Sequence, residues 1–377
     1  MKKLLFASLA ALSLVACTSE SAKQDPREHF QIYLCIGQSN MVGAARPEAQ
    51  DSIVPDRFLN LAAVNDIDRT MGEWRPATPP LCRRWSGLGP VDYFGRTMLE
   101  YIPETDTIGI IEVAVNGTSI VLFDKEKGEE YCHAPERPDW MAREIEFYDH
   151  KPYERLITLA RQAQQRGVIK GILLHQGCTD AYNDQWLANV HKIYNDILND
   201  LGLDAANVPL LAGEAIGADQ NGVCKHANPC IDRLHDSIPN GWVISSHNCE
   251  AGPDNLHFSA AGYRRLGRRY GIKMLQLQGY NVENDTDCEL QCEYTVSENA
   301  FDVKCEYSAE KMTVAIESAE ALTSVDIVSY SGATLATVEA KGEKNIVLDV
   351  KPFANEDRLV LNIHSEGGKT VNKQIDR

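Results

Sequence analysis

The stretch Gln31-Ile-Tyr-Leu-Cys-Ile-Gly37-Gln38-Ser39-Asn40-Met41 decides the fold of the first domain. It begins as an apolar run of strand-forming residues, and the run stops at Gly37, where the chain can turn away from a sheet. Ser39 follows almost at once, so its hydroxyl is expected at the carboxyl end of a strand. This position is typical of a nucleophile, because open α/β sheets bind ligands beyond the carboxyl ends of their strands.

Strand-like and helix-like segments alternate along the chain after this stretch. Apolar residues recur at helical spacing in 153–166 and 185–201, and a glycine follows each of these segments as a helix stop. Continuous apolar strands that alternate with helices predict a doubly wound α/β sandwich of three layers, whose mostly parallel sheet is covered on both faces. The expected strands are residues 30–36, 107–115, 168–174, 208–213 and 242–246.

Two long segments without clear periodicity interrupt this pattern: residues 47–90, with Trp74 and Trp85, and about 123–151, with Tyr131, His133, Trp140 and Tyr148. Long irregular segments of a compact domain usually rim or cover a site, although a packed surface excursion is an equal alternative. The final helix of the domain is expected to follow a turn at residue 254 and to end near Gly279. Its basic residues at 264, 265, 268 and 269 are interpreted as a solvent-facing surface.

The first residues of the chain predict export and a lipid anchor. A basic start at Lys2 and Lys3 precedes the apolar run 4–14, and Leu14-Val-Ala-Cys17 resembles a bacterial lipobox. We therefore expect a signal peptide over 1–17, lipidation at Cys17, a tether over 18–28, and a protein anchored in the periplasm or at the outer membrane or cell surface. A plain secretory signal with an accidental cysteine is the alternative.

Composition excludes some partners. The net charge of −17 argues against a nucleic-acid partner and favours a neutral substrate over an anionic one, although net charge says little about a single cleft. The chain has 11 cysteines, for which an exported compartment permits disulfides whose pairing stays open. No CxxC pair has a matching CxxC or HxxxH, so we expect no metal site.

The style of the sequence changes near its end. Residues 294–377 contain short alternating segments separated by glycine turns, which predicts a small all-β sandwich domain. The acidic, polar residues 281–293 form the expected linker, and 29–280 form the α/β domain. The sandwich could dock a glycan, buttress the first domain or act as a spacer.

A serine needs a base, and the base needs a group that holds its tautomer. Asp254-Asn-Leu-His257 supplies both: in a turn, the carboxylate can reach Nδ1 while Nε2 points across the sheet edge to Ser39. The order Ser, Asp, His is compatible with α/β serine hydrolases. A helix-capping serine and a surface Asp/His pair would be the interpretation of either motif alone.

Four blocks in order carry a family resemblance: Gly37–Met41 (GQSNM), residues 115–119 (VNGTS), His175-Gln-Gly177 and Asp254–Phe258 (DNLHF). The chain thereby resembles the SGNH hydrolase superfamily, and within it the sialate O-acetylesterase-like and family 6 carbohydrate esterase (acetylxylan esterase type) branch. The resemblance spans about residues 30–279 and implies an SGNH, flavodoxin-like fold.

The resemblance also implies the roles of the site residues. Ser39 would attack the acyl carbonyl, His257 would act as general base and then acid, and Asp254 would orient it. The backbone N–H groups of Ser39 and Gly117 and the side-chain amide of Gln176 would hold the oxyanion, with no cofactor. The remaining candidate oxyanion or binding residues are Gln38 and Asn40.

Two positions depart from the family pattern: Cys178 stands where the HQGE block has Glu, and Val42 where related esterases often carry Glu. Glu214 could compensate, although a solvated strand-end carboxylate is the simpler interpretation, and His175 is expected to be a packed histidine.

The expected activity is removal of O-acetyl groups from a polysaccharide or oligosaccharide through an acetyl-enzyme. Acetylxylan-type substrates rank ahead of sialic-acid-type sugars, and the alternatives are a catalytically weak glycan-binding lipoprotein and a lipase or thioesterase.

Overall fold

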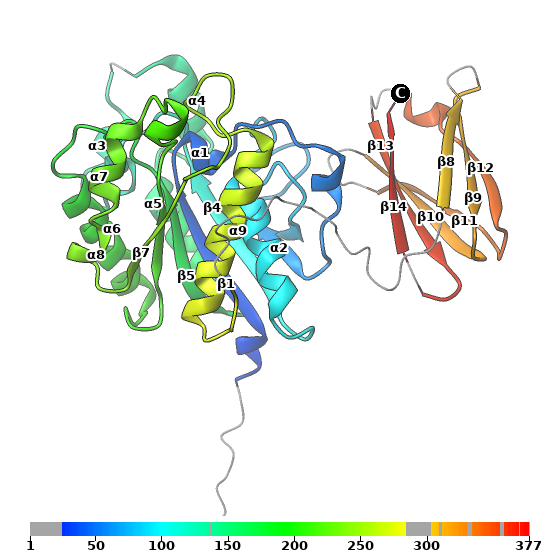
Figure 1. The fold of residues 1–377 in the computed structure, drawn as a ribbon, viewed down its shortest axis with the longest axis horizontal. Coiled ribbons are helices and arrows are strands. Elements are labelled where there is room, and N and C mark those ends of the chain that lie inside the picture. The colour runs from blue at the N-terminus through cyan, green and yellow to red at the C-terminus, as the bar shows by residue number, and fades with distance from the viewer. Residues whose placement is uncertain are drawn as a thin grey trace, which may run out of the picture.

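The computed structural model describes residues 25–135, 137–283, 303–308, 311–329, 334–354, 358–368 and 370–376 (Figure 1). The predicted signal peptide, the lipid-attachment residue Cys17 and most of the predicted linker lie outside these residues. Part of the predicted tether is described: Pro26–His29 form the 3-10 helix η1, and Glu28 within it pairs with Lys170 at 2.5 Å. Among the described residues, no helix is both long and apolar enough to cross a bilayer.

A seven-stranded sheet with the order β3-β2-β4-β1-β5-β6-β7 forms the first domain. β3 pairs antiparallel with β2, and every other pair in this sheet is parallel. The doubly wound α/β prediction is therefore confirmed, and all five predicted strands are present, with β2 and β3 added in the first irregular segment. The strands are β1 (Phe30–Gly37), β2 (Phe58–Leu61), β3 (Trp74–Pro76), β4 (Thr107–Ala114), β5 (Val168–His175), β6 (Leu210–Gly213) and β7 (Gly241–Ile244).

Helices cover both faces of this sheet. The sequence analysis did not predict α2, because Gly95 weakens its helical pattern. In the structure a Cβ at Gly95 would lie 2.0 Å from the Phe58 ring, so the glycine lets α2 pack closely on β2. The helices are α1 (Ser39–Val42), α2 (Pro90–Tyr101), α3 (Gly128–Cys132), α4 (Asp139–Glu146), α5 (Pro152–Ala163), α6 (Trp186–Leu201), α7 (Asn228–Ile231), α8 (Leu234–Ser237) and α9 (Ala260–Leu277), with 3-10 helices η2 (Ala49–Ser52), η3 (Ile120–Phe123), η4 (Ala218–Gln220) and η5 (Lys225–Ala227).

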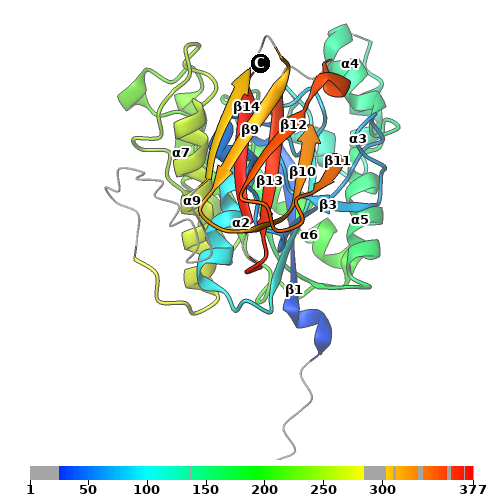
Figure 2. The same ribbon diagram turned by 90° about the vertical axis from the view of Figure 1, so that its right-hand side faces the viewer.

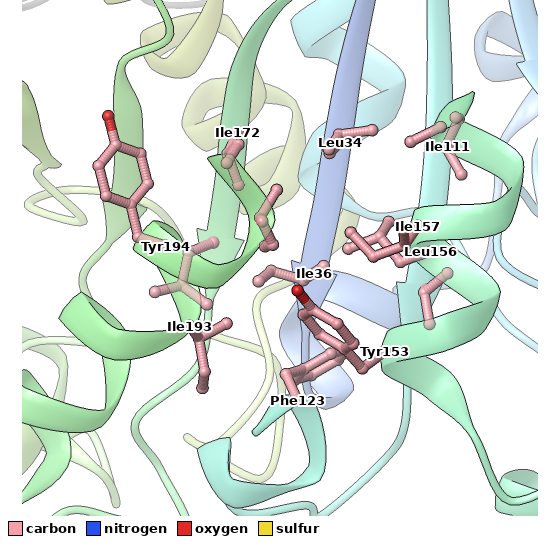
Figure 3. Packing of buried hydrophobic residues seen from close by; sticks show 14 of the residues in the cluster. Leu34, Ile36, Ile111, Phe123, Tyr153, Leu156, Ile157, Ile172, Ile193 and Tyr194 are labelled. Atoms are coloured by element: carbon pink, nitrogen blue, oxygen red, sulfur yellow. The ribbon is translucent and has the colours of Figure 1, made fainter. Parts of the chain in front are cut away.

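The central strand β1 is buried on both faces, which explains its uninterrupted apolar run. Leu34 and Ile36 point toward α5 and α6, where they pack with residues such as Leu156 and Ile193 (Figure 3). Alternate residues of the same strand, such as Tyr33, belong to a second core with α2 and α9. These two helices lie side by side in Figure 1.

The strand order places the end of β1 at a topological switch point. β4 and β2 lie on one side of β1, and β5, β6 and β7 lie on the other. Ligands of this architecture bind at such a point, beyond the carboxyl ends of the strands. Ser39 begins α1 at this point. Gly37 permits the turn, because a Cβ there would lie 2.3 Å from the carbonyl oxygen of His175.

The prediction that residue 264 faces solvent is wrong. Arg264 is 5% exposed, and its guanidinium donates to both carboxylate oxygens of Asp51 at 2.9 and 2.7 Å and to Glu48 at 2.6 Å. A buried charge requires such partners, and they come from a distant part of the sequence. Arg264 therefore fastens α9 to the first irregular segment.

The C-terminal residues form two antiparallel sheets, of order β11-β10-β13-β14 and β12-β9-β8, which confirms the all-β domain (Figure 2). Apolar side chains including Val314, Val325 and Leu361 fill its core. The predicted start at 294 lies outside the described residues. The elements are β8 (Val303–Ser308), β9 (Thr313–Ser318), β10 (Leu322–Ser329), β11 (Thr334–Glu339), β12 (Asn345–Asp349), η6 (Lys351–Phe353), β13 (Arg358–Ser365) and β14 (Thr370–Asp376).

Candidate active site

A cavity of about 740 Å³ lies at the carboxyl edge of the sheet, and both Ser39 and His257 line it. Ser39 comes from the start of α1, directly after the central strand, and is 8% exposed. His257 comes from the turn before α9, near the other end of the domain. The fold thus brings together the two side chains that the sequence analysis named as nucleophile and base.

The Asp254 carboxylate holds the His257 ring. Asp254 Oδ2 lies 2.7 Å from His257 Nδ1, and Oδ1 accepts from the backbone N–H groups of Leu256 at 3.0 Å and His257 at 2.9 Å. Partial burial alone would raise the pKa of Asp254, but these hydrogen bonds outweigh it and lower the pKa to about 2. The carboxylate is therefore ionised at neutral pH and can fix the tautomer that leaves Nε2 free to accept a proton.

Two backbone N–H groups at the cavity suit an oxyanion. In the first turn of α1, the carbonyl of Gln38 accepts from the N–H groups of Met41 and Val42 at 2.7 and 2.9 Å. The N–H of Ser39 comes before these donors and therefore has no acceptor within the helix. Gly117 has φ +64°, and it also lines the cavity. No described residue accepts a hydrogen bond from either N–H. Both donors were named from the sequence.

The second irregular segment fixes the loop that carries Gly117. Glu144, from α4, accepts from the backbone N–H of Asn116 at 2.8 Å and from its side-chain amide at 2.5 Å. Glu144 also pairs with the buried guanidinium of Arg83 at 2.5 Å. On the other side, Thr179 Oγ1 donates to the carbonyl of Gly117 at 2.9 Å. The loop is therefore held from both sides.

Gln176 does not take the predicted oxyanion position. Its side-chain nitrogen faces Asp180 at 2.6 Å, Thr118 O at 3.1 Å and Gln38 Oε1 at 3.2 Å, and its oxygen accepts from Trp186 Nε1 at 2.5 Å. The residue is 2% exposed and is not part of the cavity wall. Since interior acceptors occupy both amide hydrogens, contact with an oxyanion does not fit this geometry, and Gln176 supports the surrounding loops instead.

Gln38 organises the loop that follows β5. Its Oε1 accepts from the backbone N–H groups of Gly177 at 3.2 Å and Thr179 at 3.3 Å. Gln38 itself is 3% exposed, although it contributes to the cavity wall. The residue beside the nucleophile thereby fixes the neighbouring loop.

Asn40 connects the nucleophile to the histidine turn. Its Nδ2 donates to the carbonyl of Leu256 at 3.0 Å, and its Oδ1 accepts from Tyr263 Oη at 2.7 Å. The side chain is fully buried and does not line the cavity. Its contacts indicate a positioning role, in contrast to the substrate contact expected from the sequence.

Two further side chains named from the sequence lie outside the cavity. Glu214 accepts from the N–H of Ser246 at 2.7 Å, and its contact adds to the effect of burial in raising the pKa of Asp232 to about 6. His175 is buried, and burial lowers its pKa to about 3. As expected, His175 is a packed, neutral histidine, whereas Glu214 contacts Ser246 in the loop after β7 and Asp232 between α7 and α8.

The wall of the cavity is not acidic. Among the described residues that form it, Arg46 carries a positive charge and none is Asp or Glu, although the chain has a net charge of −17. Trp85 and Trp140, one from each irregular segment, also line it, which agrees with the expectation that these segments rim a site. Sequence reasoning missed Arg46, and the signal available was a basic residue five positions after the end of the nucleophile block at Met41.

A second depression of about 540 Å³ adjoins the cavity through the shared residues Gly117 and Thr179. Its charged residues are Lys127, Glu130 and Arg137. The Arg137 guanidinium lies 3.5 Å from the centre of the Tyr131 ring, and no described residue forms an ion pair with it. The depression thus carries two cationic side chains and one carboxylate beside the cavity that contains Arg46.

Comparisons with known proteins agree with this architecture. A family model described as carbohydrate esterase, sialic acid-specific acetylesterase, matches residues 29–276. A protein from Arabidopsis thaliana is similar with a TM-score of 0.51 and 19% identity, over 67% of this chain and 99% of that chain. NanS is similar with a TM-score of 0.50 and 15% identity, over 67% of this chain and 98% of that chain. A carbohydrate acetylesterase from Xanthomonas citri has a TM-score of 0.43 and 12% identity, over 92% of this chain and 80% of that chain. The first two similarities show the fold.

Proposed function

This chain belongs to the carbohydrate esterase family of sialic acid-specific acetylesterases, and on that premise we propose that it removes O-acetyl groups from a sugar with Ser39 as nucleophile. One observation carries the proposal: Ser39 and His257 line the same cavity while the Asp254 carboxylate lies 2.7 Å from His257 Nδ1. A serine becomes nucleophilic when such a base takes its proton.

The proposed reaction has two halves. His257 Nε2 takes the proton of Ser39 as Oγ attacks the acetyl carbon, and the oxyanion that forms is stabilised by the N–H groups of Ser39 and Gly117. The intermediate collapses to an acetyl-enzyme as the protonated His257 gives its proton to the leaving sugar oxygen. Water then attacks the acetyl carbon, His257 takes its proton, and acetate leaves as Ser39 is reprotonated. The ionised Asp254 stabilises the imidazolium in both halves.

The charge of the cavity bears on the choice of sugar. The acidic chain favoured a neutral acetylxylan in the sequence analysis, but a substrate responds to the local field of the cleft rather than to the net charge. Arg46 lies in the wall of a cavity without acidic residues, and the adjoining depression contains Lys127 and Arg137 against the single carboxylate of Glu130. A guanidinium is well suited to bind a carboxylate. We therefore rank a sialic-acid-type sugar ahead of acetylated xylan.

Export and lipid anchoring remain part of the proposal. They rest on the lipobox-like sequence that ends at Cys17. Labelling with a radioactive or clickable fatty acid, compared between the full chain and Cys17→Ala, tests this part: incorporation into both proteins, or into neither, would contradict the anchor.

The esterase proposal is tested by hydrolysis of a chromogenic acetyl ester. Ser39→Ala should lower kcat at least about 1,000-fold, because the nucleophile is lost. Ser86→Ala is the matched control, since Ser86 lines the same cavity and should leave the rate within about threefold. Equal rates for the wild type and Ser39→Ala would favour a glycan-binding protein. A preference for long acyl chains over acetyl would favour a lipase or thioesterase.

The sugar is tested separately with O-acetylated sialic acid and acetylated xylo-oligosaccharides. The wild type should prefer the acidic sugar, and Arg46→Ala should raise KM for that sugar about tenfold with little effect on the neutral chromogenic ester. If the xylo-oligosaccharide is preferred and Arg46→Ala changes neither KM, the sugar assignment fails while the esterase assignment stands.

A further inference from the structure

Two cysteines meet in the wall of the active-site cavity. Cys178 lies in the loop after β5, and Cys224 lies between η4 and η5. Both line the cavity, and both are free thiols in this structure. The two thiols perturb each other: the interaction raises the pKa of Cys178 and lowers that of Cys224. The other cysteines that the structure describes do not line the cavity.

The first of these cysteines belongs to the loop that is attached to the nucleophile. The residues on either side of Cys178 donate their backbone N–H groups to Gln38 Oε1, from Gly177 at 3.2 Å and from Thr179 at 3.3 Å. Gln38 directly precedes Ser39. The position of Cys178 is therefore coupled to the nucleophile through the hydrogen bonds of its two neighbours to the Gln38 side chain.

The second cysteine belongs to the loop that is attached to the histidine turn. Val223, next to Cys224, donates its N–H to the carbonyl of Asn255 at 2.9 Å. Asn255 lies between Asp254 and His257 and has φ +51°. This turn is open to solvent on one side, since the Asp254 side chain is 51% exposed. The Asn255 carbonyl thus ties the loop of Cys224 to the turn, so a restraint on Cys224 would be transmitted to the histidine.

We propose that Cys178 and Cys224 form a disulfide that joins these two loops and fixes the position of His257 relative to Ser39. Their shared place in the cavity wall, on two neighbouring loops, is the geometric basis for the bond, which requires the two sulfur atoms to approach each other within the cavity. The bond restrains the nucleophile's loop and the base's loop relative to each other. Both cysteines are thereby positioning residues for the site.

The oxidant is a disulfide, either a small molecule or a second protein, and the reaction is thiol–disulfide exchange. Cys224 attacks first as its thiolate, because the interaction with Cys178 lowers the pKa of Cys224. One sulfur of the oxidant leaves as a thiol, which produces a mixed disulfide on Cys224. The deprotonated Cys178 then attacks the Cys224 sulfur and releases the second thiol. Two protein thiols are oxidised, and one disulfide is reduced to two thiols.

The test incubates the full chain in oxidised and in reduced glutathione and maps its peptides by mass spectrometry without reduction. The expected result is a Cys178–Cys224 cross-link under oxidising conditions. The oxidised protein should melt about 5 °C or more above the reduced protein. Its kcat for a chromogenic acetyl ester should be about three- to tenfold higher at similar KM, because the restraint acts on geometry and not on substrate binding.

Three variants complete the experiment. Cys178→Ser and Cys224→Ser should match the reduced wild type in kcat and lose their response to glutathione. Cys230→Ser is the control, since Cys230 is half-buried and lies outside the cavity, and it should respond as the wild type does.

Free thiols at 178 and 224 in oxidised glutathione, a cross-link to another cysteine, or an unchanged melting temperature on oxidation would overturn the proposal, as would equal kcat values in an active enzyme. Only the kcat measurement rests on the proposed function. The peptide map and the melting temperature decide the matter even if the protein hydrolyses no ester.

Discussion

Different interactions position the proposed nucleophile and the proposed base. Ser39 is 8% exposed and follows the central strand of the sheet, where core packing and buried hydrogen bonds fix it. By contrast, the side chains of His257 and Asp254 are 24% and 51% exposed. Hydrogen bonds within their own turn hold them. Changes around Ser39 should therefore be felt in folding, and changes around Asp254 mainly in catalysis.

The largest effect is expected from Asp254→Ala. Without the carboxylate, neither the tautomer nor the orientation of His257 is fixed, and kcat for an acetyl ester should fall about 1,000- to 10,000-fold. The melting temperature should change little, because the side chain is half-exposed. Parallel measurement of kcat and thermal unfolding checks both halves of the expectation.

The chain contains a matched control for this variant. Asp219 and His247 form a second carboxylate–imidazole contact, at 3.5 Å, in loops that do not line the cavity. Asp219→Ala should leave kcat within about threefold of the wild type. If both variants lose activity equally, or if Asp254→Ala loses activity only by unfolding, the contrast between the two regions is wrong.

Asn40 is the side chain that joins the two regions, so Asn40→Ala should affect both. It removes the donor to Leu256 O and leaves the buried Tyr263 hydroxyl without its acceptor. We expect the free energy of unfolding to fall by about 1–3 kcal/mol and kcat to fall about 10- to 100-fold. Urea unfolding and ester hydrolysis measure the two effects.

Tyr263→Phe separates the two functions of Asn40. It removes the hydrogen bond to Asn40 Oδ1 but leaves the bond from Asn40 to Leu256 in place. Stability should therefore fall by about 0.5–1.5 kcal/mol while kcat stays within about threefold. A loss of activity as large as that of Asn40→Ala would show that the link to the turn is not what Asn40 supplies.

A smaller effect is expected at the loop that carries Gly117. Glu144→Gln keeps the shape of the side chain but removes the charge that faces the buried Arg83 and one of the two acceptors for Asn116. We expect kcat to fall about fivefold through the misplaced N–H of Gly117, with stability reduced by about 1–2 kcal/mol. Glu146→Gln, on the exposed face of the same helix, should change neither measurement.

Local chemistry made much of the site predictable. Gly37 and Ser39 mark the end of a strand, and Asp254 and His257 lie close enough in sequence for one turn to bring them together. These patterns depend on a few neighbouring residues, so sequence and structure agree on them. The sheet was predictable for a similar reason, because strands buried on both faces are continuously apolar.

The orientations of side chains, and their partners from distant parts of the sequence, were not predictable in this way. The sequence identifies Gln176 within a motif, but only tertiary packing shows that its amide points toward Asp180 and away from the cavity. The buried pair of Arg264 with Asp51 joins segments far apart in the chain. The net charge averages over the whole surface and therefore gave no indication that the described cavity wall contains Arg46 and no acidic residue.

The smallest expected effect concerns acid stability and Asp254. Its pKa is about 2 in the folded protein and 3.8 without the fold, so the folded state favours the ionised carboxylate. A lowered pKa contributes stability above about pH 3.8, and this contribution is lost as the pH falls toward 2. The melting temperature of the wild type should therefore exceed that of Asp254→Asn by a small, constant amount from pH 5 to 7. The difference should be small because solvent screens the half-exposed carboxylate, and it should shrink between pH 4 and pH 2 as the carboxylate is protonated. A difference that is unchanged at pH 2 would mean that the hydrogen bonds of the turn do not act through the charge of Asp254.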